Sequence, residues 1–138
     1  MKNGICAGIG VLGSVIASFF GGWTAAMTTL LIFMSIDYIT GLVVAGIFHK
    51  SKKTENGALE SKAGFKGLCK KCMILLFVLI GYRLDLSIGT VYIKDAVCIG
   101  FMVNELISII ENAGLMGISV PEPITKAVEI LKDKNETV

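Results

Sequence analysis

The amino-acid sequence predicts an all-α integral membrane protein: a helical bundle with three or four transmembrane helices, a basic cytoplasmic loop and a short polar C-terminal tail. Three observations lead to this fold class. The chain of 138 residues is 54% hydrophobic and only 17% charged, whereas soluble domains carry about 25% charged residues. The charges gather in patches and leave long uncharged runs, the longest from residue 3 to residue 36. The mean hydropathy of +0.74 exceeds what the surface of a small soluble enzyme tolerates.

The uncharged N-terminal run is too long for one membrane crossing. A straight helix through it would be about 50 Å long, against a hydrocarbon core of about 30 Å. We therefore place a break at Gly21-Gly22, beside Trp23, whose indole is typical of the membrane interface. The first apolar helix, residues 4–21, either spans the membrane or lies at its surface, and we expect it to be retained rather than cleaved as a signal peptide. Small residues on one face allow close helix packing in lipid; they are Gly10, Ser14, Ala17 and Gly21.

Residues 23–48 form the second predicted helix, which has the length of a tilted membrane span. Asp37 lies near its middle, where a carboxylate costs about 2.5–3.5 kcal/mol on the insertion scale. Eleven Leu, Ile, Phe and Val residues between Leu30 and Phe48 each return roughly 0.3–0.6 kcal/mol. The helix therefore still inserts, by a narrow margin, and its embedded carboxylate indicates a functional role. Gly41 and Ala45 are further candidates for helix packing.

Residues 49–71 have the character of a soluble loop and are strongly basic. Because loops rich in Lys and Arg stay in the cytoplasm, we place this loop on the cytoplasmic side. From Ser61 a helix can begin that continues into the membrane. Its lysines at i, i+4 and i+8 either rest on anionic phospholipid, worth about 1 kcal/mol each, or form an ordinary solvated face. The basic residues of the loop are Lys50, Lys52, Lys53, Lys62, Lys66, Lys70 and Lys71.

Two more apolar segments follow, at residues 72–92 and 95–112. Lys94 and Asp95 mark the hairpin between them, which lies outside the cell if the basic loop lies inside. Residues 113–138 form a cytoplasmic tail in which glycines and prolines end the fourth apolar helix before a short polar helix. This pattern predicts three crossings, and a fourth depends on residues 4–21.

Charged residues inside the predicted spans are candidates for a role in assembly, because such residues usually pair with one another. Counted from the cytoplasmic edge, Asp37 and Arg83 each lie about 16 Å deep, so we expect them to pair, within the chain or between subunits. Asp85 cannot share a helix face with Arg83, and Glu105 has no equally clear partner. Alternatively, Arg83 and Asp85 lie at the outer interface. The intramembrane candidates are thus Asp37, Arg83, Asp85 and Glu105.

The sequence gives no indication of an enzyme. It contains no Ser/His/Asp set and no Gly-rich phosphate loop, so we assign no catalytic residue and no cofactor. Cys69 and Cys72 have C-x-x-C spacing, but no second pair completes a zinc site and His49 is the only histidine. We therefore assign no metal and interpret the two cysteines as reduced thiols. The net charge of +2 does not indicate nucleic-acid binding.

Several segments together resemble a holin family of Gram-positive bacteria and their phages that acts in phage lysis and toxin secretion. They are DYITG at residues 37–41 with Ala45 after it, SKAGFKGL at 61–68 with Lys70-Lys71, NELISIIEN at 104–112, and the exit from Gly117 to Pro121. They follow the order of that family and cover most of the chain after Trp23. The resemblance implies a protein that accumulates in the bacterial cytoplasmic membrane, forms homo-oligomers and opens holes. Its functional partner would be a cell-wall hydrolase (endolysin) or a large secreted toxin.

Two other functions are compatible with the residues alone. A small ion or proton channel, or a transporter subunit, would use Asp37, Arg83 and Glu105 and give selective currents without lysis. A membrane scaffold of a secretion complex would use the basic loop as its docking surface and cause no leakage. All three functions predict a multi-pass protein of the cytoplasmic membrane with a cytoplasmic C-terminus.

Overall fold

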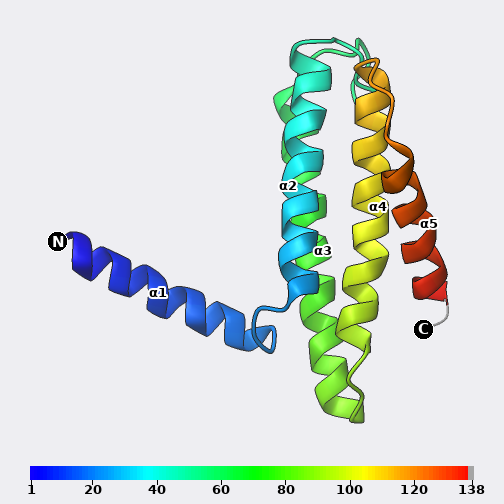
Figure 1. The fold of residues 1–138 in the computed structure, drawn as a ribbon. Coiled ribbons are helices and arrows are strands. Elements are labelled where there is room, and N and C mark those ends of the chain that lie inside the picture. The colour runs from blue at the N-terminus through cyan, green and yellow to red at the C-terminus, as the bar shows by residue number, and fades with distance from the viewer. Residues whose placement is uncertain (137–138) are drawn as a thin grey trace.

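The computed structural model describes residues 1–136 and contains five α-helices in this range, with no strand (Figure 1). The helices are α1 (Lys2–Phe19), α2 (Ala25–Gly46), α3 (Ser61–Ile88), α4 (Ile93–Leu115) and α5 (Glu122–Glu136). The predicted all-α fold is confirmed. By length and composition, α1 and α2 are apolar enough to cross a membrane.

Helices α2, α3 and α4 form an antiparallel bundle in which α4 packs against both of the others (Figure 1). Helices α2 and α3 touch each other much less. We call the end where residues 47–60 join α2 to α3 the loop end, and the end where residues 89–92 join α3 to α4 the hairpin end. The half of the bundle near the hairpin end has an apolar core, made of Met27, Leu30, Met34, Val78, Cys98 and Met102.

Glycines and a threonine cap set the bounds of these helices. Gly21 and Gly22 have positive φ angles of 78° and 90°, so they end α1 where the sequence analysis places the break. Thr24 caps α2, since its hydroxyl accepts a hydrogen bond of 3.3 Å from the Met27 amide. Gly89, in the left-handed conformation, ends α3.

The basic loop is shorter than the predicted residues 49–71. Helix α3 begins at Ser61, so only residues 47–60 connect α2 to α3. Lys62, Lys66, Lys70 and Lys71 therefore lie on α3 rather than in a loop. The helix that can begin at Ser61 is thus confirmed, and it brings Lys71 rather than Arg83 level with the middle of α2.

The two terminal helices take opposite positions around the bundle (Figure 1). Helix α1 projects away from the bundle at the hairpin end, and Ala17 is its only buried residue. Helix α5 returns along α4, against which Val128 is buried. The predicted tail therefore contains a helix that packs on the bundle, whereas α1 does not pack as a fourth bundle helix.

Candidate functional site, a buried charge cluster

Three charged side chains from three helices meet inside the loop-end half of the bundle. The Lys71 ammonium of α3 lies 2.8 Å from Asp37 Oδ2 of α2 and 2.7 Å from Glu105 Oε2 of α4. The side chain of Lys71 is 15% exposed, and those of Asp37 and Glu105 are each 7% exposed. Each helix of the bundle therefore contributes one charge to a single buried cluster.

Asn112 extends this cluster toward the loop end. Its amide nitrogen donates to Asp37 Oδ1 at 3.2 Å, to the Asp37 carbonyl at 3.3 Å and to Thr40 Oγ1 at 2.9 Å. Thr40 in turn donates to the carbonyl of Ile36, one turn earlier on α2. The polar contacts thus join α4 to the backbone of α2 as well as to its carboxylate.

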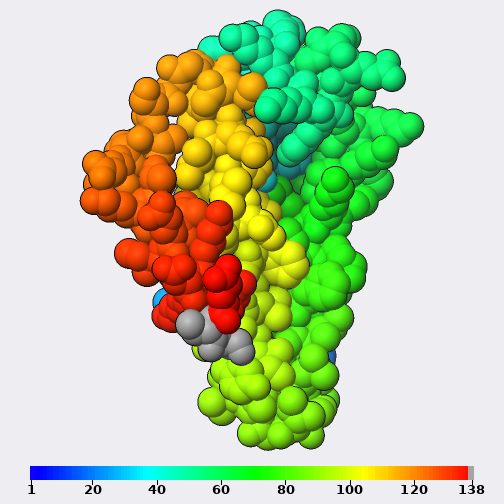
Figure 2. Space-filling model, turned by 90° about the vertical axis from the view of Figure 1, so that its right-hand side faces the viewer, coloured from blue at the N-terminus to red at the C-terminus, as the bar shows by residue number. Residues whose placement is uncertain are grey.

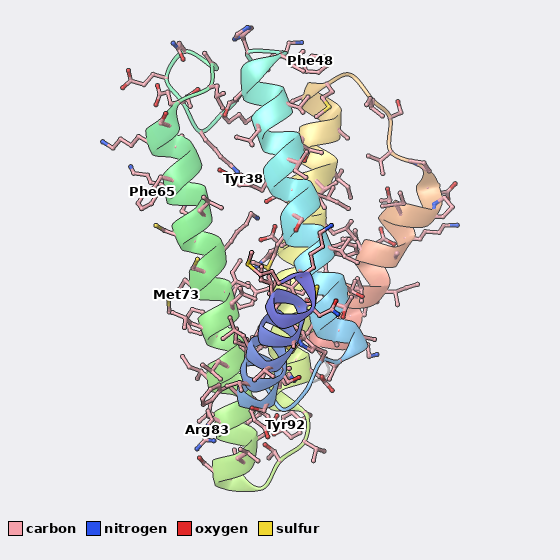
Figure 3. The ribbon with its side chains drawn as sticks, turned by 90° about the vertical axis from the view of Figure 1, so that its left-hand side faces the viewer. Tyr38, Phe48, Phe65, Met73, Arg83 and Tyr92 are labelled. Atoms are coloured by element: carbon pink, nitrogen blue, oxygen red, sulfur yellow. The ribbon has the colours of Figure 1, made fainter. Side chains whose placement is uncertain are left out.

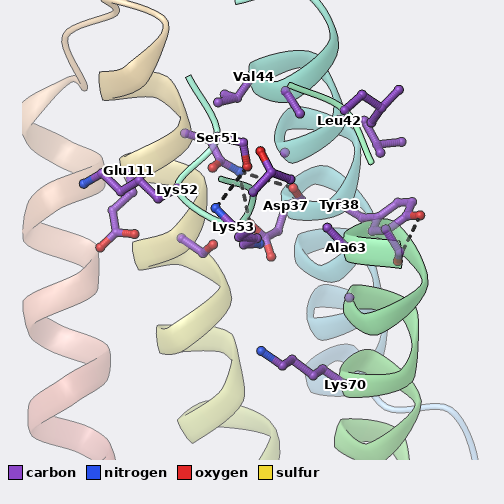
Figure 4. A pocket seen from close by; sticks show the side chains of 18 of the residues that line it. Asp37, Tyr38, Leu42, Val44, Ser51, Lys52, Lys53, Ala63, Lys70 and Glu111 are labelled. Atoms are coloured by element: carbon purple, nitrogen blue, oxygen red, sulfur yellow. Dashed lines mark hydrogen bonds between the residues drawn. The ribbon is translucent and has the colours of Figure 1, made fainter. Parts of the chain in front are cut away.

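A cavity of about 260 Å³ opens beside the cluster, between α2, α3, α4 and the basic loop (Figure 4). Small residues widen it where α2 faces α3, among them Gly41, Gly64 and Gly67. Tyr38 bridges these two helices, and its hydroxyl lies 3.4 Å from the Gly64 carbonyl. The cavity explains why α2 and α3 touch so little and depend on Lys71 and α4 for their connection.

The chemistry of the cluster is that of a structural ion network. One ammonium between two carboxylates leaves a formal charge of −1, and its groups satisfy one another by charge-assisted hydrogen bonds. Removal of one partner from such a buried network costs about 3–5 kcal/mol, because the remaining charge is left unpaired. The cluster therefore fixes the register of α2, α3 and α4 relative to one another.

At the hairpin end, Asp85 caps the start of α4. Its carboxylate accepts hydrogen bonds from the Thr90 hydroxyl at 2.5 Å and from the amides of Ile93 and Lys94 at 2.9 and 3.0 Å. A carboxylate at a helix N-terminus satisfies amides that have no partner within the helix. Asp85 therefore has a structural role in the α3–α4 turn.

Lys94 joins the end of α1 to the hairpin end of the bundle. Its ammonium donates to the carbonyls of Phe20 and Gly22 and lies 5.5 Å from the centre of the Tyr82 ring. Tyr82 also contacts the turn after α1, because a Cβ at Gly21 would overlap its ring. A buried lysine thus binds two carbonyls of the turn that follows α1, at the helix end that favours a cation.

Comparison with known proteins identifies the family. The profile of the bacteriophage holin family matches residues 14–133 of the chain. The chain belongs to this family. Proteins of the family are generally not enzymes, and the family together with the two apolar helices indicates a membrane protein.

Individual relatives cover nearly the whole chain. An uncharacterized protein of Listeria innocua is 39% identical over 92% of this chain and 87% of its own length. An uncharacterized 14.9 kDa protein from the nagH 3′ region of Clostridium perfringens is 34% identical over 96% of both chains. A probable holin of Bacillus phage phi105 is 24% identical over 86% of this chain and 83% of its own length. No solved structure matches the chain significantly.

The prediction that Asp37 pairs with Arg83 of the same chain is wrong, because Asp37 pairs with Lys71. The prediction measured depth from Cys72, taken as the cytoplasmic edge of the membrane, whereas the start of α3 at Ser61 is level with the end of α2. Asp37 lies nine residues before the end of α2, and Lys71 lies ten residues after the start of α3, so these two residues share a level. Arg83 is exposed and lies toward the hairpin end, at about the level of Tyr92 (Figure 3).

The structure brings together only part of the residues that the sequence singled out. Asp37 and Glu105 meet in the cluster, whereas Arg83 and Asp85 lie toward the hairpin end. Among the packing candidates, Ala17 and Ala45 are buried, and Gly21 and Gly41 lie close to Tyr82 and Asn112. Gly10 and Ser14 are exposed on the projecting α1.

Sequence reasoning missed Lys71, Asn112 and Lys94 as members of the polar contacts. Lys71 was assigned to the loop with its exposed neighbour Lys70, and no local pattern separates the two. The signal that could have found Lys71 is the helix that can begin at Ser61, because depth counted from this start places Lys71 level with Asp37. Asn112 and Lys94 lie at the ends of a predicted span, where polar residues are ordinary.

Proposed function

We propose that this chain is a holin that forms homo-oligomers in the bacterial cytoplasmic membrane and opens holes large enough for folded proteins. The observation that carries the proposal is the match of the bacteriophage holin family over residues 14–133. The cargo is a cell-wall hydrolase, which then reaches the cell wall, or a large toxin. The chain performs no chemical reaction on this cargo.

We further propose that α2, α3 and α4 cross the membrane with the loop end in the cytoplasm. Lys50, Lys52 and Lys53 are exposed in the loop, and basic loops remain on the cytoplasmic side. Trp23 and Tyr92 are exposed near the hairpin end, where they suit the outer interface. In this orientation α4 ends on the cytoplasmic side, where the tail emerges, and the basic residues near the loop can contact anionic phospholipid.

The buried cluster allows this chain to accumulate in the membrane before holes form. With Lys71 between Asp37 and Glu105, no charge of the cluster faces lipid, so a single chain can accumulate as a closed bundle. In an oligomer, water or neighbouring chains can take over these contacts. The cluster thus supports accumulation first and assembly later.

Inducible expression in a bacterium tests the proposal. The chain is expressed alone and together with a cytoplasmic cell-wall hydrolase, while turbidity and release of a large cytosolic enzyme are followed. A holin causes abrupt loss of viability, and lysis only when the hydrolase is present. Selective depolarisation without release of the large enzyme would instead support a channel. Continued growth with normal membrane levels of the protein would support a scaffold.

A matched pair of variants tests whether the buried cluster is needed for accumulation and for the timing of lysis. Lys71→Met leaves two buried carboxylates without a cation, whereas Lys70→Met removes an exposed neighbouring lysine. We expect Lys71→Met to lower the amount of protein in the membrane and to shift or abolish the time of lysis, and Lys70→Met to keep both. Immunoblotting of the membrane fraction separates loss of protein from loss of hole formation.

A further inference from the structure

Helix α5 lies along α4 at a depth where a charged helix cannot face lipid. It runs back from the loop end toward the hairpin end (Figure 1). Near its C-terminus, Asn135 lies beside Gly100, since a Cβ added at Gly100 would be 3.4 Å from the Asn135 amide nitrogen. Gly100 is fifteen residues before the end of α4, about 22 Å along the helix axis. The docked α5 therefore reaches far beyond the loop end.

The exposed aromatic side chains of Trp23 and Tyr92 give a reference for this depth. If Tyr92 lies at the outer interface, a hydrocarbon core of about 30 Å extends over roughly twenty residues of α4, to about residue 112. Gly100 then lies about 12 Å inside the core from Tyr92. The segment of α5 beside Gly100 includes Lys132, Asp133 and Glu136, which are all exposed.

The outer face of α5 is charged along its whole length. Seven of its fifteen residues are charged, and all seven are exposed; they are Glu122, Lys126, Glu129, Lys132, Asp133, Lys134 and Glu136. A charged residue near the centre of the bilayer costs about 2.5–3.5 kcal/mol. The depth of α5 and its charge are therefore compatible only if water, rather than lipid, covers this side.

The flank of α4 next to α5 carries two exposed polar residues, whereas the exposed face of α2 carries no charged residue. Asn104 and Glu111 are exposed on α4. Asn104 and Lys132 line a groove of about 750 Å³ whose remaining walls are largely apolar, among them Phe77. Figure 2 shows α5 covering one side of α4 on this flank. By contrast, Asp37 is the only charged residue of α2 and is buried, so the exposed face of α2 is uncharged.

We propose that the α4–α5 flank faces the water-filled hole in the assembled oligomer and that the outer face of α2 remains toward lipid. This assignment rests on the proposed holin function and adds which surface of the chain lines the hole. Before assembly, α5 lies at the cytoplasmic surface, because the α4 flank then faces lipid. Helix α5 docks on α4 when neighbouring chains enclose water.

A disulfide between α4 and α5 tests this assignment. The pair Gly100→Cys and Asn135→Cys joins residues that are adjacent in the docked position. The control pair Gly114→Cys and Asn135→Cys places one cysteine about 21 Å further along α4. The native cysteines stay in place, and mass spectrometry of peptides from oxidised membranes identifies which cysteines are joined. Samples are taken before and after the onset of hydrolase release.

We expect the intrachain disulfide between residues 100 and 135 to increase several-fold at the onset of release, and the control pair to stay at background. Cells that contain the disulfide should keep releasing the hydrolase, because α5 is then fixed in its hole-lining position. The assignment is overturned if release proceeds while the disulfide stays at background, if the disulfide is equally abundant before release, or if it blocks release. Absence of release from the wild-type chain would instead contradict the proposed function.

A second variant tests the physical reason for the change. Glu129→Leu with Asp133→Leu removes two exposed charges from the deep part of the outer face of α5, so that lipid can cover the docked helix at a lower cost. With this change, the disulfide between residues 100 and 135 should be more abundant before release than in the pair without it. Glu122→Leu with Lys126→Leu, an ion pair of 3.1 Å nearer the loop end, is the control and should change the early disulfide less. Equal effects of the two double variants would refute the dependence on depth.

Discussion

The two halves of the bundle are held together in different ways. Near the hairpin end, the core consists of apolar side chains such as Leu30, Val78 and Met102. Near the loop end, Lys71, Asp37 and Glu105 form an ion network beside a cavity. Apolar packing holds the helices together in the hairpin-end half, and a few ion pairs and hydrogen bonds hold them together in the loop-end half.

This difference has a physical consequence in a membrane. Lipid tails are as apolar as leucine, so apolar cores there are stabilised by close packing rather than by exclusion of water. Such packing tolerates small shifts of one helix along another. An ammonium held between two carboxylates does not, because a shift of one turn would leave charges unpaired in a low-dielectric environment. The ion network in the loop-end half therefore fixes the register of the three helices, and the apolar side chains of the hairpin-end half pack in that register.

The largest loss of stability is expected from Lys71→Met in the loop-end half. Two adjacent carboxylates then lose their shared cation, and we expect the unfolding free energy in mixed detergent micelles to fall by about 3–5 kcal/mol. Titration with a denaturing detergent, followed by circular dichroism, measures the change. Lys70→Met is the control, because this lysine is exposed one position away.

The triple variant Asp37→Asn, Lys71→Met and Glu105→Gln tests why Lys71→Met is destabilising. The cause is either the loss of attraction within the network or the presence of unpaired buried charges. Replacement of a whole buried ion network by well-packed hydrophobic residues is often neutral or stabilising. The amides of this variant likewise leave no buried charge unpaired, so it should recover most of the stability that Lys71→Met loses. A triple variant as unstable as Lys71→Met would mean that the network itself stabilises the bundle. In that case the loop-end half would depend on attraction rather than on the absence of unpaired charge.

The next largest effect is expected from Leu30→Ala in the hairpin-end half. Leu30 is 1% exposed, and its truncation leaves a cavity that costs about 2 kcal/mol, at the low end of buried Leu→Ala changes because lipid solvates the separated helices. The same detergent titration measures it. Ile32→Ala is the matched control, since Ile32 on the same helix is exposed. Equal losses from both variants would contradict a packed apolar core in this half.

The sequence predicts the apolar half of this molecule better than the polar half. Apolar runs and glycine breaks are local, so the number of long helices and the turn at Gly21-Gly22 follow from composition and spacing. The partner of Asp37 is not local, because Lys71 lies 34 residues away along the chain. Its position depends on which residue of α3 lies level with the end of α2. Depth counted from Cys72 rather than from Ser61, the start of α3, replaced Lys71 by Arg83 as the expected partner.

The position of α5 could not be predicted for a different reason. Its sequence indicates a polar helix, and a polar helix at the end of a membrane protein is most simply placed in the cytoplasm. Packing of Val128 and Asn135 against α4 depends on small residues such as Gly100, which local patterns do not connect to the tail. The charge of the helix was visible in the sequence, but its depth was not.

A smaller effect is expected from Asp85→Ala at the α3–α4 turn. The change removes the acceptor for the Thr90 hydroxyl and for two amides at the start of α4. We expect a lower thermal midpoint in detergent and faster proteolysis within residues 89–92. Asp95→Ala, which removes an exposed carboxylate in the first turn of the same helix, should change both less. Equal effects would show that charge near the start of α4, rather than the hydrogen bonds of Asp85, stabilises the turn.

The smallest effect is expected from Asn112→Ala, which removes the amide that joins α4 to Asp37 and Thr40. Hydrogen bonds between membrane helices contribute about 0.6–1.7 kcal/mol, so the loss should be well below that of Lys71→Met. Asn104→Ala is the control, because Asn104 is exposed on the same helix. In the triple neutral variant Asn112→Ala should cost still less, since Asp37→Asn removes the charged acceptor and leaves neutral hydrogen bonds. An undiminished cost there would mean that Asn112 acts through Thr40 and the α2 backbone, and the polar half would then consist of two independent contacts instead of one network.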